Sequence, residues 1–445
     1  MLTSEQKASF KAYDIRAKSD VLTDNFSFLL GKASGDYFKK TSKKKSVVIG
    51  RDGRLSSPRL HRHFVKGILA SGMDVEDIGI VSTPQFYYFV KYAAKKTNAG
   101  GVMITASHLQ GEYNGFKFVD QYSSYVHSGN GLGEVLAALE KDNSPTLSKK
   151  RGKRVAVTKT KVSSRYESFL SSQIKEKLPY SLVIDVSNGS GQAEARVLRK
   201  LAKRCKVING TCLGTFPAHD PDPLPPKNRK QLENEVKKNK ADFGIIFDGD
   251  ADRMVVIDKR GNQIESGIIA LVLAKHLKQP RIVSTCNMSL VLENHLPQKG
   301  TLVTCAIGRS KVHESMKKIK ANIGAERSGH FYFKQLGFTD AAGLAAIHFL
   351  SNVTPEDLLL AKESYMAPET NIVVANKDRA LKRIESAFAK KAKQILRIDG
   401  ISLFFEEYWF NIRASNTEEL LRITIEGKNK KTVDAFLKKI QQVAS

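Results

Sequence analysis

A three-part pattern of short apolar segments recurs three times along the chain. Each copy opens on a strand-like segment: SVVIGRDGR (46–54), SLVIDVSNGSG (181–191) and RIVSTCN (281–287). A second apolar segment follows in each copy, at 77–84, 207–217 and 301–310. The third segments end in polar clusters, at 100–108, 243–253 and 321–330. Because lysine-rich segments with helical spacing lie between them, the pattern predicts βαβ units. We therefore expect three related α/β domains with mixed, largely parallel sheets.

Chain length and linker composition predict four domains. The 445 residues suggest roughly three domains or a few more, at about 150 residues each. Residues 141–154 combine proline, serine and clustered bases, as linkers do. Beyond residue 368, a helix-like segment, strand-like segments and a final amphipathic helix predict a small α+β domain. The expected boundaries are 1–150, 151–256, 257–367 and 368–445.

The charge balance indicates anionic partners. Lys and Arg total 72 against 45 acidic residues, a net charge of +27. Nucleic acid, an acidic membrane surface and phosphorylated small molecules all fit such an excess. The bases are scattered, however, and no nucleic-acid-binding motif occurs, so we expect no nucleic-acid partner. No apolar run is long enough to insert into a membrane, and four cysteines without metal or disulfide spacing suit a reducing cytoplasm.

The polar cluster of the second copy predicts a metal site. Asp248, Asp250 and Asp252 alternate along DGDADR, so their carboxylates project to one side of an extended backbone. Without a cation they would repel one another. An EF-hand is excluded, because its sixth and twelfth positions hold Arg253 and Lys259 instead of Gly and Glu. Three carboxylates favour a divalent cation, most readily Mg²⁺.

The polar cluster of the first copy, TASH at 105–108, could present Ser107 as a nucleophile after an apolar strand. A helix-capping serine beside a solvent-exposed histidine is the simpler alternative. The chain has no GxSxG elbow and no Walker A loop, so an α/β-hydrolase and an ATP-binding P-loop are disfavoured. If phosphoryl groups are transferred, the protein itself is the favoured carrier.

Two further clusters suit sugar and phosphate recognition. In ERSGH, Glu326 and Ser328 alternate and could bind a sugar diol together, although an ordinary polar turn explains the segment equally well. The segment RASNT supplies donors for a phosphate, with Arg422 beyond it; its candidate residues are Arg413, Ser415, Asn416 and Thr417.

Together and in this order, the clusters resemble the α-D-phosphohexomutase superfamily, in particular its bacterial phosphomannomutase/phosphoglucomutase type. FKAYDIR, TASH with YNGFK, DGDADR, ERSGH and RASNTE are similar to the family's motifs over essentially the whole chain. The resemblance implies three related α/β domains and a smaller fourth domain around a central cleft. We name four segments accordingly: the serine loop (105–117), the aspartate loop (248–253), the sugar loop (326–330) and the phosphate loop (413–417).

The resemblance also implies a mechanism. Ser107 would carry a phosphoryl group beside Mg²⁺ held by Asp248, Asp250 and Asp252, with Ser107 completing the metal site. A hexose 1,6-bisphosphate would form as intermediate and activator, and would return its other phosphate to Ser107. Glu326 and Ser328 would hold the sugar, and the phosphate loop with Arg422 the distal phosphate. Candidates for proton transfer or phosphate neutralisation are Arg16, His108, Lys117 and His330. The substrates would be small sugar phosphates, and the enzyme a cytoplasmic monomer or dimer.

Several positions depart from the family pattern. Leu109-Gln110 replaces Asn-Pro after TASH, and Ala17, Ala325 and Glu419 replace Gly, Gly and Pro. Because the charged and nucleophilic groups persist, we expect activity, with the effect on loop flexibility or turnover left open. The alternatives are a phosphoglucosamine mutase, which Ala251 and Arg327 fit less well, and a catalytically silent sugar-phosphate binder.

Overall fold

The computed structural model describes residues 2–141, 148, 151–415 and 419–444. Its contacts gather into two compact units. The first unit consists of residues 1–263 and 328–351, and the second of residues 264–327 and 352–445. Among the described residues, no helix has both the length and the apolar character needed to cross a bilayer.

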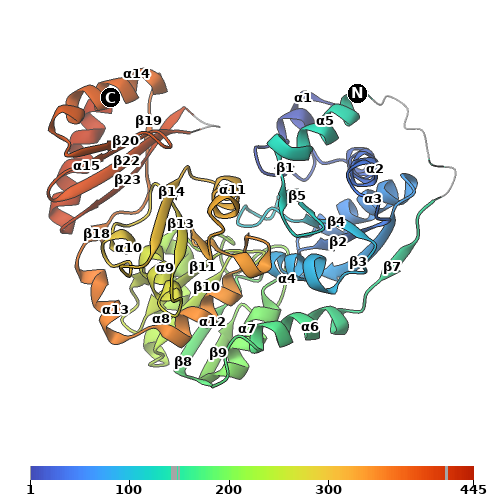
Figure 1. The fold of residues 1–445 in the computed structure, drawn as a ribbon, viewed down its shortest axis with the longest axis horizontal. Coiled ribbons are helices and arrows are strands. Elements are labelled where there is room, and N and C mark those ends of the chain that lie inside the picture. Colours follow the sequence, from blue (N-terminus) through green and yellow to red (C-terminus); the bar gives the residue numbers. More distant parts are fainter. Residues whose placement is uncertain (1, 142–147, 149–150, 416–418, 445) are drawn as a thin grey trace. The chain divides into compact units, whose positions relative to one another are not determined.

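The first sheet has the order β1-β5-β4-β2-β3-β7 (Figure 1). Its strands are β1 (Ile15–Lys18), β2 (Ser46–Arg51), β3 (Asp74–Ile80), β4 (Asn98–Ile104), β5 (Tyr113–Asp120) and β7 (Arg154–Ala156). Strands β4, β2, β3 and β7 run parallel, whereas β5 pairs antiparallel with β4, and β1 pairs antiparallel with β5. Helices α2 (Asp24–Thr41) and α3 (Ser57–Ala70) pack together, and their apolar residues join the core of this sheet. A short helix, α4 (Thr83–Tyr88), follows β3.

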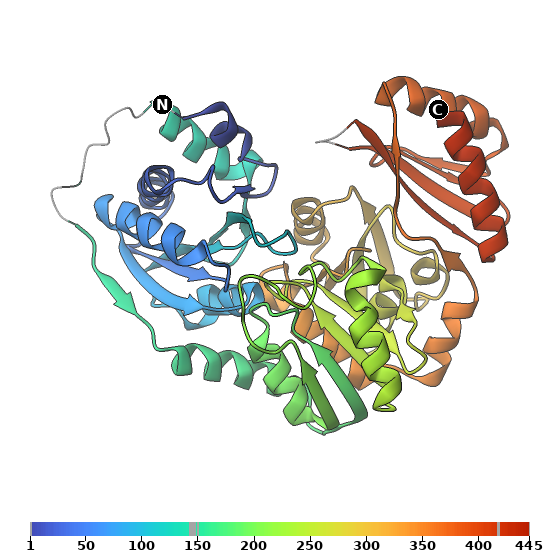
Figure 2. The ribbon, with the colours of Figure 1, turned by 180° about the vertical axis from the view of Figure 1, so that it is seen from behind.

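The second sheet has a parallel centre in the order β10-β8-β9, and β11 pairs antiparallel with β10. Its strands are β8 (Leu178–Asp185), β9 (Ala202–Ile208), β10 (Phe243–Phe247) and β11 (Met254–Asp258). Its helices are α6 (Lys159–Ser171), α7 (Gln192–Leu201) and α8 (Pro226–Lys238). Figure 2 shows α8 lying along the sheet, where Leu232 and Val236 enter the core.

The second unit contains three parallel strands in the order β14-β13-β15. They are β13 (Arg281–Thr285), β14 (Thr301–Cys305) and β15 (Ile323–Ala325). Around them stand α9 (Ser266–Ala274), α10 (Val291–Asn294) and α11 (Arg309–Ile319). In the first unit, β16 (Phe331–Phe333) pairs with β17 (Thr339–Asp340), and α12 (Ala342–Asn352) follows.

The strand order confirms the predicted repeat. In each copy the first strand is central, the second lies on one side and the third on the other: β4-β2-β3, β10-β8-β9 and β15-β13-β14. The predicted range of one segment is wrong. The second strand of the second copy is β9 at 202–208, and the predicted range 207–217 contains only its end. Strand β9 is a sheet edge whose Lys203, Arg204 and Lys206 interrupt the apolar pattern.

The last part of the second unit is an antiparallel sheet in the order β18-β23-β22-β21-β20, with β19 also paired to β23. It confirms the predicted small α+β element. Its strands are β18 (Tyr365–Met366), β19 (Thr370–Val373), β20 (Gln394–Leu396), β21 (Ile401–Phe404), β22 (Tyr408–Ala414) and β23 (Leu420–Gly427). Helices α14 (Lys377–Phe388) and α15 (Lys430–Ala444) cover it and share its apolar core (Figure 2).

The remaining elements are short. They are α1 (Ser4–Ala8), η1 (Phe89–Ala93), β6 (Tyr125–Val126), η2 (Ser128–Leu132), α5 (Gly133–Lys141), β12 (Gln263–Ile264), η3 (Lys334–Leu336), α13 (Pro355–Leu359), η4 (Leu360–Lys362) and η5 (Ala389–Lys391).

Candidate active site

Ser107 stands at the carboxyl end of β4 with its hydroxyl directed at the aspartate loop. Its backbone is left-handed, with φ of 54°, a conformation that costs a non-glycine residue energy and that needs support from its neighbours. The Thr105 hydroxyl provides support by accepting the Ser107 N–H at 2.9 Å. The Ser107 Oγ donates to Asp248 Oδ2 at 2.7 Å and lies 3.3 Å from Asp252 Oδ1. The predicted nucleophile and the predicted aspartates therefore meet.

Arg54 holds the backbone of the serine loop. Its side chain is fully buried, and it donates to the carbonyl oxygens of Ser107 at 2.8 Å, Leu109 at 2.6 Å, Gln110 at 2.6 Å and Tyr113 at 3.0 Å. Its Nε donates to Asp52 at 3.0 Å. The rigid fork of a guanidinium can serve several acceptors at once, which an ammonium cannot do in the same geometry. The turn that contains Leu109-Gln110 is thus shaped by a buried cation.

The aspartate loop follows β10 and folds back on itself. Asp248 Oδ1 accepts the N–H groups of Asp252 at 3.0 Å and Arg253 at 3.1 Å. Gly249 passes so close to the serine loop that a Cβ there would lie 2.5 Å from the Ser107 carbonyl oxygen. Only a glycine fits this approach without moving one of the loops.

Three donors converge on one oxygen of Asp250. Lys117 Nζ, from β5, lies 2.6 Å from Asp250 Oδ2 and 2.6 Å from Asp252 Oδ2. The hydroxyls of Thr83 at 2.6 Å and Thr105 at 3.2 Å also donate to Asp250 Oδ2. The other oxygen, Oδ1, is buried without a hydrogen-bond partner among the described residues.

Burial and charge divide the acidity of the cluster unequally. Burial, followed by the charges of Asp252 and Asp250, raises the pKa of Asp248 well above its usual range. Burial opposes ionisation of Asp252 too, but Lys117, His330 and Arg253 together hold its pKa well below the usual range. The cluster therefore favours a cation or a proton at Asp248.

The three aspartates fit a divalent cation. Each offers an oxygen within 4.8 Å of the others, and all three residues are buried. The unpartnered Asp250 Oδ1 and the raised pKa of Asp248 are what an oxygen-ligated cation would relieve. Ser107 Oγ lies within hydrogen-bond distance of two of these carboxylates, so it is near enough to share the site.

The two candidate histidines are held differently. Burial, then the charges of Arg253 and Arg16, holds the pKa of His108 well below its usual range, so its imidazole is neutral at physiological pH. His330 Nε2 accepts from Arg253 Nε at 3.2 Å and lies 3.3 Å from Asp252 Oδ1, while its Nδ1 contacts Ser328 Oγ at 2.9 Å. Arg16, on β1, pairs with Asp14 at 2.7 Å.

In the second unit, Glu326 follows β15 and is nearly buried. Its Oε1 accepts the N–H of Gly308, the residue before α11, at 3.0 Å. The neighbouring Arg327 donates to the Thr424 hydroxyl at 3.1 Å and to the Ala367 carbonyl, so the sugar loop is tied to the C-terminal sheet. The predicted alternatives for this segment were a sugar contact and an ordinary turn. Arg327 has a further role, because its contacts position the sugar loop against the C-terminal sheet.

Two arginines of the phosphate loop region face each other across β22 and β23. Arg413 and Arg422 are register partners, and both lie near the one carboxylate of Glu369, at 3.8 and 3.7 Å. Like charges placed opposite each other in a sheet repel, which an anion between them would relieve. Ser415 is buried, and its carbonyl accepts from Lys377 Nζ at 3.1 Å. Asn416 and Thr417 lie outside the described residues.

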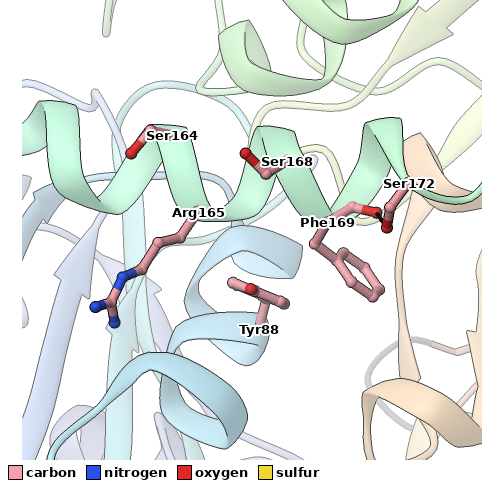
Figure 3. Close-up of a pocket in the computed structure, with 6 residues that line it drawn as sticks. All are labelled: Tyr88, Ser164, Arg165, Ser168, Phe169 and Ser172. Carbon is pink, nitrogen blue, oxygen red and sulfur yellow. Dashed lines mark hydrogen bonds between the residues drawn. The ribbon is translucent and has the colours of Figure 1, made fainter.

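A shallow hollow elsewhere on the first unit contains none of the predicted site residues. Figure 3 shows its lining, which comes from α6 and the end of α4. The lining residues are Tyr88, Ser164, Arg165, Ser168, Phe169 and Ser172.

The structure adds residues that the motifs do not single out. Thr83 is the first residue of α4 and reaches Asp250 across 167 positions of sequence. Lys377 and Glu369 belong to segments without any motif, yet they contact the phosphate loop region. For Thr83, the signal in the sequence was the repeat: its second segment ends at STP (82–84), which predicts the end of a strand at this position.

Three consecutive α/β modules, a C-terminal α+β module and a buried serine–aspartate cluster define the class. Profiles described as phosphoglucomutase/phosphomannomutase alpha/beta/alpha domains I, II and III match residues 7–127, 161–261 and 261–365, and the C-terminal domain profile matches 369–443. The chain belongs to the phosphoglucomutase/phosphomannomutase family.

Individual relatives span nearly the whole chain. A phosphomannomutase of Methanocaldococcus jannaschii is 31% identical and covers 98% of this chain and 97% of its own. A phosphoglucomutase of Neisseria meningitidis is 32% identical, at 98% and 96% coverage. A phosphoglucomutase/phosphomannomutase family protein of Burkholderia thailandensis has a similar fold, with a TM-score of 0.86, 23% identity and coverage of 100% and 97%. These matches confirm the family resemblance and the four-domain fold.

Proposed function

We propose that this phosphohexomutase interconverts hexose 6-phosphate and hexose 1-phosphate, with mannose, glucose or both as the sugar. Ser107 carries the phosphoryl group, and a hexose 1,6-bisphosphate is the intermediate. The observation that carries the proposal is the Ser107 hydroxyl, 2.7 Å from Asp248 inside a buried cluster that also contains Lys117. The names of the relatives, phosphomannomutase and phosphoglucomutase, support both sugars.

Asp248, Asp250 and Asp252 would hold Mg²⁺, with Ser107 beside them. When bound, the cation supplies positive charge that neutralises the transferring phosphoryl group and the three carboxylates. Lys117 adds a fixed positive charge from the protein, because two carboxylates hold its ammonium at 2.6 Å.

The transfer itself exchanges one P–O bond for another. The bond between phosphorus and Ser107 Oγ breaks, its electron pair stays on Oγ, and a new bond forms to a sugar hydroxyl oxygen. The proton of that hydroxyl needs an acceptor, and the released Oγ needs a proton. The neutral imidazole of His108 and the imidazole of His330, whose Nε2 lies 3.3 Å from Asp252 Oδ1, are the candidates for proton movement. Arg16 and Lys117 are suited to charge neutralisation instead.

Recognition of the substrate involves two kinds of group. Glu326 and Ser328 would accept and donate hydrogen bonds to the sugar hydroxyls, and the bidentate arginines 413 and 422 would bind the distal phosphate. Ser415, Asn416 and Thr417 would add neutral donors. The repulsion between the two facing arginines supports an anion at this position.

The domains proposed are 1–150, 151–256, 257–367 and 368–445, which the four matched ranges support. We further propose a cytoplasmic enzyme that acts as a monomer or dimer.

The experiment combines a chemical and a kinetic readout. Phosphopeptide mass spectrometry of the purified chain, after incubation with glucose 1,6-bisphosphate, should place a phosphate on Ser107. Ser107→Ala should lower kcat on glucose and mannose 1-phosphates by about 10⁴-fold or more, because no other described hydroxyl occupies this position. Ser34→Ala is the matched control, because Ser34 is a buried serine of α2 whose hydroxyl donates to the Leu30 carbonyl of the same helix.

Removal of divalent cations by a chelator should abolish turnover, and Mg²⁺ should restore it. Full activity in excess chelator, or near-normal turnover of a contamination-free Ser107→Ala preparation, would contradict the proposal. Comparing glucosamine 1-phosphate as a substrate tests the remaining family alternative.

A further inference from the structure

A buried carboxyl group outside the cluster has no cation beside it. Glu194, on α7, is completely buried. Its Oε1 accepts a hydrogen bond from the Ser82 hydroxyl at 2.5 Å. Its Oε2 is buried and has no hydrogen-bond partner among the described residues. A buried carboxyl is costly, so its presence at this position calls for a reason.

The surroundings of Glu194 bring its pKa close to neutral pH. Burial raises its pKa to about 7, against the opposing effects of the Ser82 hydrogen bond, Tyr166 and Arg196. Tyr166 is the titratable group that faces it from α6, and its own pKa is raised well above the usual value by burial and by Glu194. Arg196 is the charged neighbour on α7. From α12, the glycine Gly343 packs against Glu194 so closely that a Cβ added to it would lie 2.5 Å from Glu194 Cγ.

Ser82, the partner of Glu194, caps helix α4. Its Oγ accepts the N–H of Gln85 at 3.2 Å, which satisfies one of the free donors of the first turn. Because the single Ser82 proton goes to Glu194, the hydroxyl lone pairs face the helix. At the other end of α4, the ring centre of Tyr88 lies 4.8 Å from that of Phe169 on α6 (Figure 3). It also lies 5.6 Å from the ring centre of Tyr166. Helix α4 is therefore fixed at both ends.

The first residue of α4 contacts the aspartate loop. Thr83 donates its N–H to the Asp250 carbonyl at 2.9 Å and its hydroxyl to Asp250 Oδ2 at 2.6 Å. These bonds occupy Asp250 Oδ2, whereas Oδ1 has no hydrogen-bond partner in the part of the chain that the structure describes. An unbroken sequence of contacts thus runs from Glu194 through Ser82 and Thr83 to Asp250.

We propose that Glu194 is a positioning residue for the aspartate loop: it fixes Ser82 at the start of α4, so that Thr83 holds Asp250 with one oxygen open to a cation. The inference rests on the proposed function only in taking Asp250 as a cation ligand. The ionised carboxylate accepts the Ser82 proton more strongly than the neutral acid does. The contacts are therefore firmest above about pH 7.

The variants Glu194→Gln and Ser82→Ala test the proposal, with the double variant beside them. Glu134→Gln is the matched control, because Glu134 on α5 is exposed and pairs with the exposed Lys40. Amide hydrogen exchange of residues 85–88 in the metal-free protein should be faster in both single variants. Calorimetric Mg²⁺ affinity should fall about three- to tenfold, and kcat by a similar factor with KM within about twofold.

Two measurements distinguish a positioning role of Glu194 from a role in the stability of the fold alone. The double variant should lose no more Mg²⁺ affinity than Glu194→Gln alone, since both residues act through one contact. The ratio of wild-type to Glu194→Gln affinity should grow from about pH 6 to about pH 8, whereas the ratio to Glu134→Gln should stay flat. Unchanged exchange and Mg²⁺ affinity in a folded Glu194→Gln protein, or losses that multiply in the double variant, would overturn the inference. A wild-type chain without mutase activity would contradict the proposed function instead, while exchange and Mg²⁺ binding judge Glu194 independently.

Discussion

The guanidinium of Arg54 takes the place of water for four backbone carbonyls of the serine loop. Its positive charge is balanced by Asp52, which the Ser57 hydroxyl also contacts at 2.5 Å, and its face lies 5.0 Å from the Phe216 ring centre. A buried acceptor without a donor costs free energy, so the loop depends on all these bonds being made at once. The departure at Leu109-Gln110 is tolerable here, because Arg54 binds main-chain atoms.

Arg54→Lys should therefore be far from conservative. An ammonium keeps the charge but loses the fork, which leaves some carbonyls unpaired, and we expect a loss of about 2–4 kcal/mol in the free energy of unfolding. Urea unfolding measures this loss, and kcat should fall with it because Ser107 loses its backbone support. Arg397→Lys, an exposed arginine paired with Glu385, should change neither quantity appreciably. An Arg54→Lys protein of wild-type stability would show that the loop holds its own shape.

For single residues, the sequence predicts contacts between groups that are close together in the chain. Asp248, Asp250 and Asp252 were predicted because alternation alone places them together, and Ser107 because it follows a buried strand. Thr83 and Glu194 were not predicted, since each contacts its partner across more than a hundred residues. A single Thr or Glu within a helix carries no local signal of such a partner.

Among the elements, β7 depends on a single carboxylate for much of its attachment. Burial alone would raise the pKa of Asp77, but His61, Arg154 and the Gly79 amide lower it to about 2. Arg154, the first residue of β7, donates to Asp77 from its Nε at 3.0 Å. The pair joins the strand that follows the linker to β3 of the first sheet.

The lowered pKa of Asp77 predicts acid sensitivity. The native state binds the Asp77 proton more weakly than the unfolded state, so the stabilisation is present above about pH 4 and is lost as pH falls toward 2. We expect about 1–2 kcal/mol, reduced because Arg154 is half exposed. Arg154→Gln should lower stability at pH 7 and matter less near pH 3. Lys153→Gln is the control; equal effects at both pH values would exclude the ion pair as the cause.

The elements were predictable where their residues are apolar throughout. Strands β2, β8, β10 and β13 are buried on both faces, which the apolar runs indicated. Strand β9 lies at an edge, so its lysines and arginines point to solvent and its pattern resembles that of a helix or loop. The sequence could not distinguish an edge strand of this kind from a helix or a loop.

For the whole molecule, the excess of positive charge has two possible uses. Many scattered charges create a field that attracts any phosphate, without the directional bonds that select among sugars. The same charge could serve solubility alone. In the proposed function, selection between substrates rests instead on directional groups such as Glu326, Arg413 and Arg422.

Salt dependence distinguishes these uses. Raising ionic strength from about 0.01 M to about 0.15 M shortens the screening length from about 30 Å to about 8 Å. If the field speeds capture, kcat/KM should fall severalfold, and by similar factors for glucose and mannose phosphates. Potassium chloride at constant free Mg²⁺ is the appropriate titrant. A flat kcat/KM across this range would leave solubility as the explanation of the charge.

The identical strand order of the three copies has a consequence for how substrate range can change. In each copy, the functional loop follows the third strand: Ser107 after β4, Asp248 after β10 and Glu326 after β15. In the proposed function, phosphoryl carriage, cation binding and sugar contact thus fall to separate, equivalent positions on separate scaffolds. Exchange of the loop after β15 for that of a relative should alter sugar choice while the loops after β4 and β10 keep their chemistry. The chain is built so that its specificity can be replaced as a part, without redesigning its reaction.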